Sequence, residues 1–536
     1  MTTAIWAVMA GLRYHAGCRV SCIAMTPPRS QALLVLLLAA VAGFKLWRSP
    51  HSASNLEIVP DSVEYTVAAE RLTAHLGYTI VVDGVTRPPR YPPWFSAGML
   101  APVLALARGE LGAAILPVFA CGVLAVLAAF AIGSRLAGPW GGAGAAVALL
   151  ANPAFTTLST LVMTEVPSLA LGLLCCVLFL RPGESLTRAQ VVAAGALGGA
   201  AFAIRPESAA FLLPVAWRIV RDQRRPWAPL LLLGTPSLLV FGATAAYNAA
   251  TFGSWHRTGY QYWCPVAFEQ AGMAFGLRYV PQNLERLFTA PRIAVLLFGA
   301  GGAVALWIRH RDLARKALVL VALAALPGTL LHVVYFYPEA RFHIVLLAFA
   351  SILGGAGLGS LLALVVRDRS WVIAVALVVA AFVPPRQADP PPHRRIVAET
   401  LAAETPADAV IVSGIDQVFL EPYVLRGTSR TIVPASRHVE YASMLVAPAA
   451  LIGLVLSPED IQSPRAPALL RAGAIDPCPI VATESPGELV RLLREGRRVF
   501  IDASFLPPDA PPQRIVPPGL HVTPNPRYRW LAELSE

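Results

Sequence analysis

The sequence predicts a polytopic α-helical membrane protein that ends in a small α/β domain. Hydrophobic residues make up 56% of the chain and charged residues only 14%, with a mean hydropathy of +0.59. Soluble domains carry about 25% charged residues. From Pro384 the long apolar segments stop and the composition becomes that of a soluble protein. The net charge of +11 does not indicate nucleic-acid binding, because the arginines cluster in short loops between apolar segments, as membrane topology rules predict.

The N-terminal segment, residues 1–30, is predicted to be cytoplasmic, because it holds three arginines and no long apolar run. Either Met1 or Met25 can serve as the start of translation. Residues 31–47 form the first apolar segment, and no clear cleavage site of small residues follows it. We therefore expect an uncleaved signal anchor.

The apolar segments predict about eleven membrane spans, several of them shorter than the usual 20 residues or so. They are residues 31–47, 111–134, 142–160, 165–180, 189–204, 208–217, 227–247, 293–307, 317–336, 344–366 and 371–383.

The loops between the spans differ in charge, and this predicts their sides of the membrane. Starting from a cytoplasmic N-terminus, the arginine-rich loops all fall on the cytoplasmic side, at 135, 181–188, 218–225, 309–316 and 367–369. The other loops fall outside, at 48–110, 161–165, 205–207, 248–292 and 337–343. An odd number of spans also places the C-terminus outside. We therefore expect a multi-pass protein of the plasma (inner) membrane.

The C-terminal part begins with a stiff proline-rich linker, residues 385–393. Residues 394–536 are predicted to form a soluble extracytoplasmic α/β domain, because short apolar strands alternate with helical patterns. The strands are expected at 409–412 and 498–502, and the helices at 395–404, 466–472 and 486–495. This part contains no glycine-rich phosphate loop, zinc-type spacing or nucleophile elbow. We expect it to recognise an acceptor or partner and to hold no catalytic residue.

The first outer loop holds the most informative polar stretch, residues 60–93. Asp61 followed three positions later by Glu64 resembles a helix capping box, and the apolar stripe that follows predicts a helix lying on the membrane surface. A carboxylate at the mouth of a membrane bundle can also act as a general base. The prolines after Tyr91 fix the backbone, either as an interfacial turn or as a rim that presents Arg90 to a phosphate. The sequence alone does not decide between a helix cap and a general base at Asp61. It also does not decide between an interfacial turn and a phosphate-binding rim at Arg90.

Other outer loops contribute residues that a helix bundle could bring to the same place. They are Glu165, Arg205, Glu207, His256, Tyr260 and Arg341. Each has a structural interpretation as well. Glu165 fits the first turn of a helix capped by Thr164, Arg205 and Glu207 fit an ion pair within a tight turn, and Arg341 fits a snorkelling anchor at a helix end.

The order of these motifs resembles that of the GT-C membrane glycosyltransferases over residues 31–384. The chain shows Asp-Ser-x-x-Tyr from Asp61, then Arg-Tyr-Pro-Pro from Arg90, Thr-Glu-x-Pro from Thr164 and Arg-Pro-Glu from Arg205. Tyr-Asn, Phe-Gly-Ser and Gly-Tyr follow, and then a late arginine. The pattern is most similar to bacterial relatives of protein O-mannosyltransferases and of lipid A aminoarabinose transferases.

This resemblance implies a GT-C-like membrane domain that transfers a hexose or pentose from a polyprenyl-phosphate donor, with inversion, to an extracytoplasmic lipid, glycan or protein. It implies Asp61 as the catalytic base. The donor phosphate would be held by Arg90, Arg205 and Arg341, and the substrates by Glu64, Tyr91, Glu165, Glu207, His256 and Tyr260. Many relatives have adjacent Asp and Glu, whereas Ser62 and Val63 separate Asp61 from Glu64 here. The resemblance leaves open whether a divalent cation is needed.

A membrane transporter or lipid flippase without transferase activity is the alternative function. Transporters commonly show internal repeats and charged residues near the membrane midplane. The sequence shows no repeat, and its Asp, Glu, Lys and Arg residues lie at the ends of the predicted spans. Charges at span ends favour a site at the rim over a path through the membrane.

The predicted topology can be tested with fusions to a reporter that is active only outside the cytoplasm. A fusion after residue 390 should be active, and a fusion within residues 309–316 should be silent, because positively charged loops stay inside. The opposite pair of results would overturn the topology.

Overall fold

The computed structural model describes residues 28–47, 60–82, 85–181, 185–263, 275–335, 338–365, 394–413, 415, 417–434, 486–504, 516 and 519–536. Several predicted segments lie outside these residues. They are almost all of the N-terminal segment, the last predicted span (371–383), the linker and the helix expected at 466–472.

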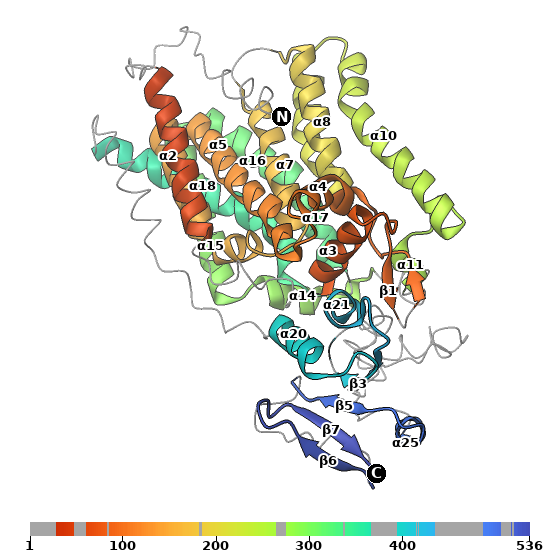
Figure 1. Cartoon of the computed structure of the whole chain (residues 1–536). Helices are drawn as coiled ribbons and strands as arrows, with labels where there is room; N and C mark the ends of the chain where they lie inside the picture. Colours follow the sequence, from red (N-terminus) through yellow and green to blue (C-terminus); the bar gives the residue numbers. More distant parts are fainter. Residues whose placement is uncertain are drawn as a thin grey trace.

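Apolar helices make up most of the fold (Figure 1). They are α2 (Pro28–Trp47), α5 (Ile115–Leu150), α7 (Glu165–Phe179), α8 (Arg188–Ile204), α10 (Trp227–Phe252), α15 (Ala290–Arg309), α16 (Arg311–Ala324), α17 (Leu326–Val333) and α18 (Ile344–Val365). Within the described residues, 5 helical segments are long and apolar enough to cross a membrane. Several shorter apolar helices accompany them. The number of spans, about eleven, stays a prediction.

Helix α5 is broken near its middle, where the sequence predicts a loop between two spans. Ala137 and Gly138 have non-helical backbone angles, with φ of 71° at Gly138, and Pro139 follows. Gly133 and Gly141 then pack so closely that neither has room for a Cβ atom. Only glycine adopts such a φ without strain, so Gly138 allows the helix to break here. The close approach of Gly133 and Gly141 shows that the chain turns back on itself as a helical hairpin.

The two ends of α7 separate two sets of polar contacts. At its C-terminal end, Arg135 donates to the carbonyl of Val177, and Arg218 donates to the carbonyls of Leu178 and Phe179. At its N-terminal end, Glu165 pairs with arginines described below. A helix of 15 residues is about 22 Å long. Loops predicted to be cytoplasmic therefore meet at one end of α7, and loops predicted to lie outside meet at the other.

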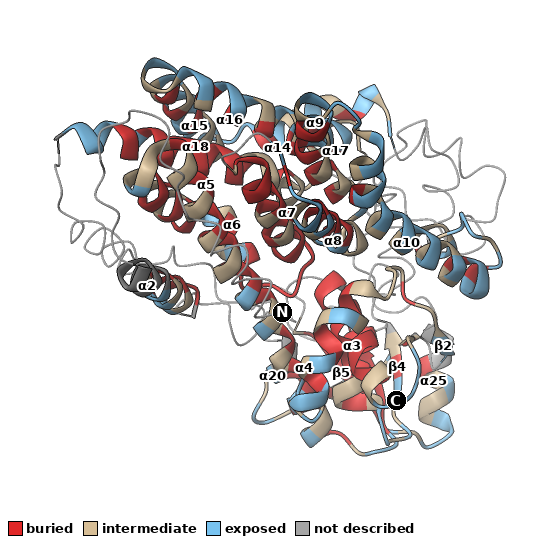
Figure 2. Ribbon diagram, turned by 90° about the horizontal axis from the view of Figure 1, so that it is seen from above, coloured by how far each residue is buried: buried red, intermediate tan, exposed pale blue. Residues whose placement is uncertain are grey.

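Helix α3 (Pro60–Thr73) corrects one expectation. It was predicted to lie on the surface, but every residue from 61 to 71 is buried, including its charged residues (Figure 2). Helices η2 (Ser96–Leu100), α4 (Ala101–Leu106) and α21 (Gln417–Leu420) pack on it. A short hairpin of β1 (Ile80–Val82) and β2 (Val85–Arg87) follows α3.

The C-terminal part contains a mixed five-stranded sheet in the order β4-β3-β5-β7-β6. Strands β3 (Val410–Ser413), β4 (Thr431–Pro434) and β5 (Val499–Asp502) are parallel, whereas β6 (His521–Pro524) and β7 (Leu531–Ser535) are antiparallel. The strands expected at 409–412 and 498–502 are β3 and β5, and the helices expected at 395–404 and 486–495 are α20 (Arg394–Glu404) and α25 (Pro486–Arg494). The side of the membrane on which the sheet lies stays a prediction.

Shorter elements connect the long helices. They are η3 (Leu111–Ala114), α6 (Pro153–Leu158), η4 (Pro206–Phe211), α9 (Leu212–Asp222), α11 (Gly259–Trp263), η5 (Leu277–Tyr279), α14 (Val280–Leu287), η6 (Ala340–His343) and η7 (Glu421–Leu425).

Candidate active site

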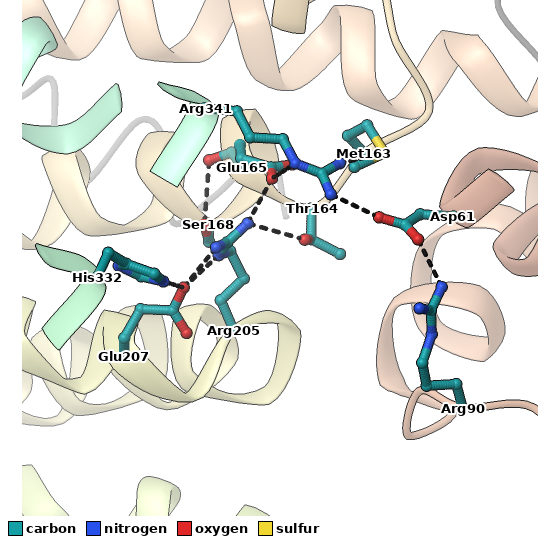
Figure 3. Close-up of polar contacts among 10 residues, drawn as sticks. All are labelled: Asp61, Arg90, Met163, Thr164, Glu165, Ser168, Arg205, Glu207, His332 and Arg341. Atoms are coloured by element: carbon teal, nitrogen blue, oxygen red, sulfur yellow. Dashed lines mark hydrogen bonds and ion pairs between the residues drawn. The ribbon is translucent and has the colours of Figure 1, made fainter. Parts of the chain in front are cut away.

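A row of alternating charges lies where α3, α7, η4 and η6 meet (Figure 3). We call it the charged cluster, and its members in spatial order are Glu64, Arg90, Asp61, Arg341, Glu165, Arg205 and Glu207. All seven were predicted from the sequence as site residues. The structure brings them together from segments far apart in the chain.

Asp61 lies between Arg90 and Arg341 in the charged cluster. Its Oδ1 accepts a hydrogen bond from Arg90 at 2.5 Å, and its Oδ2 accepts one from Arg341 at 2.8 Å. Burial alone would raise the pKa of Asp61, but the charges of Arg90 and Arg341 outweigh burial and hold it well below its ordinary value. The carboxyl group is therefore ionised in this arrangement.

The capping-box interpretation of Asp61 and Glu64 is wrong. Helix α3 begins at Pro60, so Asp61 lies inside the first turn and not at the N-cap. The carboxylate of Glu64 accepts hydrogen bonds from the backbone N–H and the guanidinium of Arg90. Both carboxylates thus bind arginines from other segments, and these charge-assisted bonds are stronger than a bond to a neutral backbone N–H.

Arg90 is held on several sides. Its guanidinium lies 4.6 Å from the ring centre of Tyr91 and 5.7 Å from that of Tyr260. Gly259, the first residue of α11, packs so closely on the backbone of Arg90 that a Cβ atom would overlap it. Burial raises the pKa of Tyr260 to about 12 and also raises that of Tyr91. Both phenols are therefore neutral rings that support the guanidinium.

Arg205 is held by two carboxylates. It pairs with Glu165 at 2.6 Å and with Glu207 at 2.6 Å, so the predicted ion pair with Glu207 is confirmed. Arg341 reaches Glu165 at 3.7 Å. Thr164 is the N-cap residue of α7 and Glu165 lies in its first turn, as predicted, but the Thr164 side chain makes no capping bond and its Oγ1 accepts from Arg205 at 3.4 Å. The helix end is thus tied to the charged cluster through side chains.

His332 was not predicted from the sequence, and it extends the charged cluster. Its Nε2 lies 3.8 Å from Glu207, and its Nδ1 lies 2.7 Å from the carbonyl of Gly328. Its ring stacks on Phe342 with 4.5 Å between ring centres. The signal that could have found it is a histidine within the apolar segment 317–336, since ionisable residues in such segments are commonly functional.

Among the described residues, His256 makes no hydrogen bond or ion pair with the charged cluster, and its role in substrate binding stays a prediction. Gly253 ends α10 with a φ of 79°, and the chain turns there. His256 is exposed, stacks on Trp255 and lies 2.9 Å from Ser254 Oγ through its Nδ1. Tyr260, only four residues later, is the part of this loop that reaches Arg90.

The charged cluster is closely packed. A cavity of about 20 Å³ lies beside Glu165, Arg205, Glu207, His332 and Arg341, enough for about one water molecule. The described part of the chain has no group of three or more His, Cys, Asp or Glu residues placed to hold a metal ion. All four carboxylates of the cluster bind arginines instead. The residues present therefore do not fit a divalent cation in this arrangement.

Comparisons with known proteins agree with this fold. Residues 89–247 match the family model described as dolichyl-phosphate-mannose-protein mannosyltransferase. The crystal structure of ArnT from Cupriavidus metallidurans in the apo state is 14% identical, covers 94% of this chain and 98% of its own, and has a TM-score of 0.55. No curated protein matches the chain.

A weaker similarity links the chain to the Archaeoglobus fulgidus oligosaccharyltransferase. Its apo structure is 13% identical, covers 76% of this chain and 64% of its own, and has a TM-score of 0.44. Its complex with Zn and sulfate covers 75% and 62%, with a TM-score of 0.42. The family match and the ArnT fold confirm the predicted resemblance to GT-C membrane glycosyltransferases.

Glu165→Gln should destabilise the folded protein. Glu165 is almost fully buried between Arg205 and Arg341, and removing one charge of a buried ion pair costs about 3 kcal/mol or more. The thermal unfolding midpoint of the detergent-solubilised protein should fall clearly. Glu285→Gln, at an exposed position on α14, should leave it unchanged. Equal midpoints for both variants would contradict a structural role for the Glu165 charge.

Proposed function

We propose that this chain, with its GT-C fold, is an integral-membrane glycosyltransferase that moves a sugar from a polyprenyl-phosphate donor to an extracytoplasmic acceptor. The observation that carries the proposal is Asp61, a buried carboxylate with an arginine on each of its oxygens, where the predicted outer loops meet. The family-model match supports sugar transfer, and the shared fold supports a membrane enzyme of this architecture. The acceptor would be a lipid, a glycan or a protein.

Asp61 would act as the general base. In an inverting displacement, the acceptor oxygen bonds to the anomeric carbon while the bond from that carbon to the phosphate oxygen breaks. The phosphate leaves with the bonding electron pair, and the acceptor proton passes to the Asp61 carboxylate. A positioned base of this kind accelerates transfer by about 10²–10⁴-fold.

The arginines would stabilise the departing phosphate, whose oxygens match the planar guanidinium fork. In the structure all three cluster arginines already bind carboxylates. The three arginines differ in their carboxylate partners. Arg205 binds two carboxylates other than Asp61, Glu165 and Glu207, at 2.6 Å each. Arg90 and Arg341 both bind Asp61. A donor phosphate can therefore replace Asp61 on Arg90 and Arg341 while Glu64 and Glu165 keep those arginines in place.

This exchange would also prepare the base. While Asp61 binds two guanidinium groups, its pKa lies far below the ordinary range and it is a weak proton acceptor. When an anionic phosphate takes its place on an arginine, Asp61 loses a positive partner and gains a negative neighbour. Both changes raise its pKa. Donor binding would thus convert a structural carboxylate into a base beside the acceptor.

The proposed location is the plasma membrane, with a cytoplasmic N-terminus and an extracytoplasmic C-terminal domain. The contacts at the two ends of α7 support this arrangement, because loops of like predicted sidedness meet at the same end. The partners that this proposed location and function imply are polyprenyl-phosphate sugars and the lipid bilayer.

Asp61→Asn should abolish most sugar transfer in membranes supplied with a panel of radiolabelled polyprenyl-phosphate sugars. The amide keeps a similar size and a hydrogen-bond acceptor but accepts no proton, so kcat should fall roughly 10²–10⁴-fold. The donor KM should not rise, because the arginines that Asp61 occupied become available to phosphate. Asp312→Asn, at an exposed position, is the matched control.

Glu64→Gln should have the smaller effect, since Glu64 contacts Arg90 and not Asp61. Near-normal turnover by Asp61→Asn would remove Asp61 as the base, and a larger loss in Glu64→Gln would assign that role to Glu64.

The pH dependence should distinguish the free enzyme from the donor complex. The acid limb of kcat/KM for the donor reports the free enzyme, and the acid limb of kcat reports the bound complex. Arg90 and Arg341 depress the pKa of Asp61 in the free enzyme, so the carboxylate stays ionised as pH falls through the ordinary range near about 4. The limb of kcat should therefore lie at higher pH than that of kcat/KM. Coincident limbs would contradict the exchange of phosphate for Asp61.

A further inference from the structure

The C-terminal end of α3 is bound by charged residues from the C-terminal part of the chain. We call this set the clamp, formed by Glu70 and Arg71 of α3 with Glu421 and Arg426. Arg426 pairs with Glu70 at 2.6 Å and with Glu421 at 2.6 Å. Arg71 lies 3.7 Å from Glu421. Two positive and two negative charges thus alternate across the junction.

Apolar packing shields three of the four clamp residues from solvent. Glu70, Arg71 and Glu421 are all less than a tenth exposed. Val418 and Phe419 of α21 belong to the same buried cluster as the apolar residues of α3, and α21 contacts α3 directly. Buried charge pairs are screened much less than surface pairs, so the clamp can hold α3 in one position.

Two connections run from the clamp to the proposed base and its partner. The first is α3 itself, because Glu70 and Asp61 lie nine residues apart on one helix, about 13 Å along its axis. The second runs through Arg71, whose Nε donates to Thr79 Oγ1 at 3.0 Å. Thr79 immediately precedes the β1–β2 hairpin, which leads to Arg90. The clamp therefore restrains both members of the Asp61–Arg90 pair.

We propose that Arg426 is a positioning residue for sugar transfer, through which the C-terminal domain sets the place of Asp61 between Arg90 and Arg341. This proposal rests on Asp61 being the base proposed above. It gives the C-terminal domain a second task besides the predicted recognition of an acceptor or partner. The domain need contribute no group that touches the substrates.

The variants that test this proposal are Arg426→Gln and Arg426→Lys in the full-length, membrane-embedded protein. Arg426 keeps 34% of its side chain exposed, so the substitution leaves no core cavity. Arg498→Gln is the matched control, because Arg498 also binds a glutamate of the C-terminal part through two nitrogens, but at an exposed position. Thermal unfolding of each variant establishes that it is folded.

Two measurements report on the position of Asp61. The first is kcat together with the acid limb of kcat/KM. A displaced base should lower kcat roughly ten- to hundredfold, and looser arginine contacts should move the acid limb to higher pH.

The second measurement needs no activity. Carbodiimide-coupled amine labelling, mapped by mass spectrometry, should mark Asp61 weakly in the unmodified protein and several-fold more in Arg426→Gln. Arg426→Lys should be intermediate, and Arg498→Gln unchanged.

A folded Arg426→Gln variant with unchanged kcat, acid limb and Asp61 labelling would overturn the positioning role. An equal response in Arg498→Gln would overturn it as well. If the unmodified protein transferred no sugar from any donor, the proposed function would fail, and the labelling would still decide whether the clamp positions Asp61.

Discussion

The contact of Asp61 with Arg90 and Arg341 is the interaction on which the rest of the arrangement depends. These arginines lie 29 and 280 positions away in the sequence. A buried charge without a partner is costly, so α3, the Arg90 loop and η6 each require the others. Glu165 and Arg205 extend the same requirement to α7 and α8. One row of paired charges thereby fixes the ends of several helices relative to each other.

Much of this could be predicted from the sequence, because charges at the ends of apolar segments are restricted in where they can lie. The sidedness of the loops alone placed Glu165, Arg205 and Arg341 at a common end of the bundle. The loop between the second and third spans was likewise predictable from Gly138 and Pro139, whose backbone preferences interrupt a helix. These features follow from local chemistry and from the membrane.

Other features depend on residues that are distant in the sequence, and local patterns misjudged them. The amphipathic pattern of α3 predicted an exposed face, but that face is covered by residues some 350 positions later, such as Arg426, which is 356 positions from Glu70. The spacing of Asp61 and Glu64 resembled a capping box, but arginines from other segments bind both carboxylates. His332 escaped notice because its partner Glu207 comes from another helix. A local sequence pattern carries no information about interaction partners that are distant in the chain.

In the proposed mechanism the same pairing explains how one site can hold three arginines that later bind a donor phosphate. A guanidinium buried without an anion would destabilise the fold by several kcal/mol, so a resting enzyme needs anions in that place. The Asp61 carboxylate offers two oxygens, as a phosphate does, and binds the two arginines that have the fewest other carboxylates at short distance. In the proposed mechanism Asp61 would thus occupy the place of the donor phosphate until the donor binds. Under this proposal the lowered pKa of Asp61 belongs to the resting state, and displacement of Asp61 by the donor would raise that pKa only when the donor is bound.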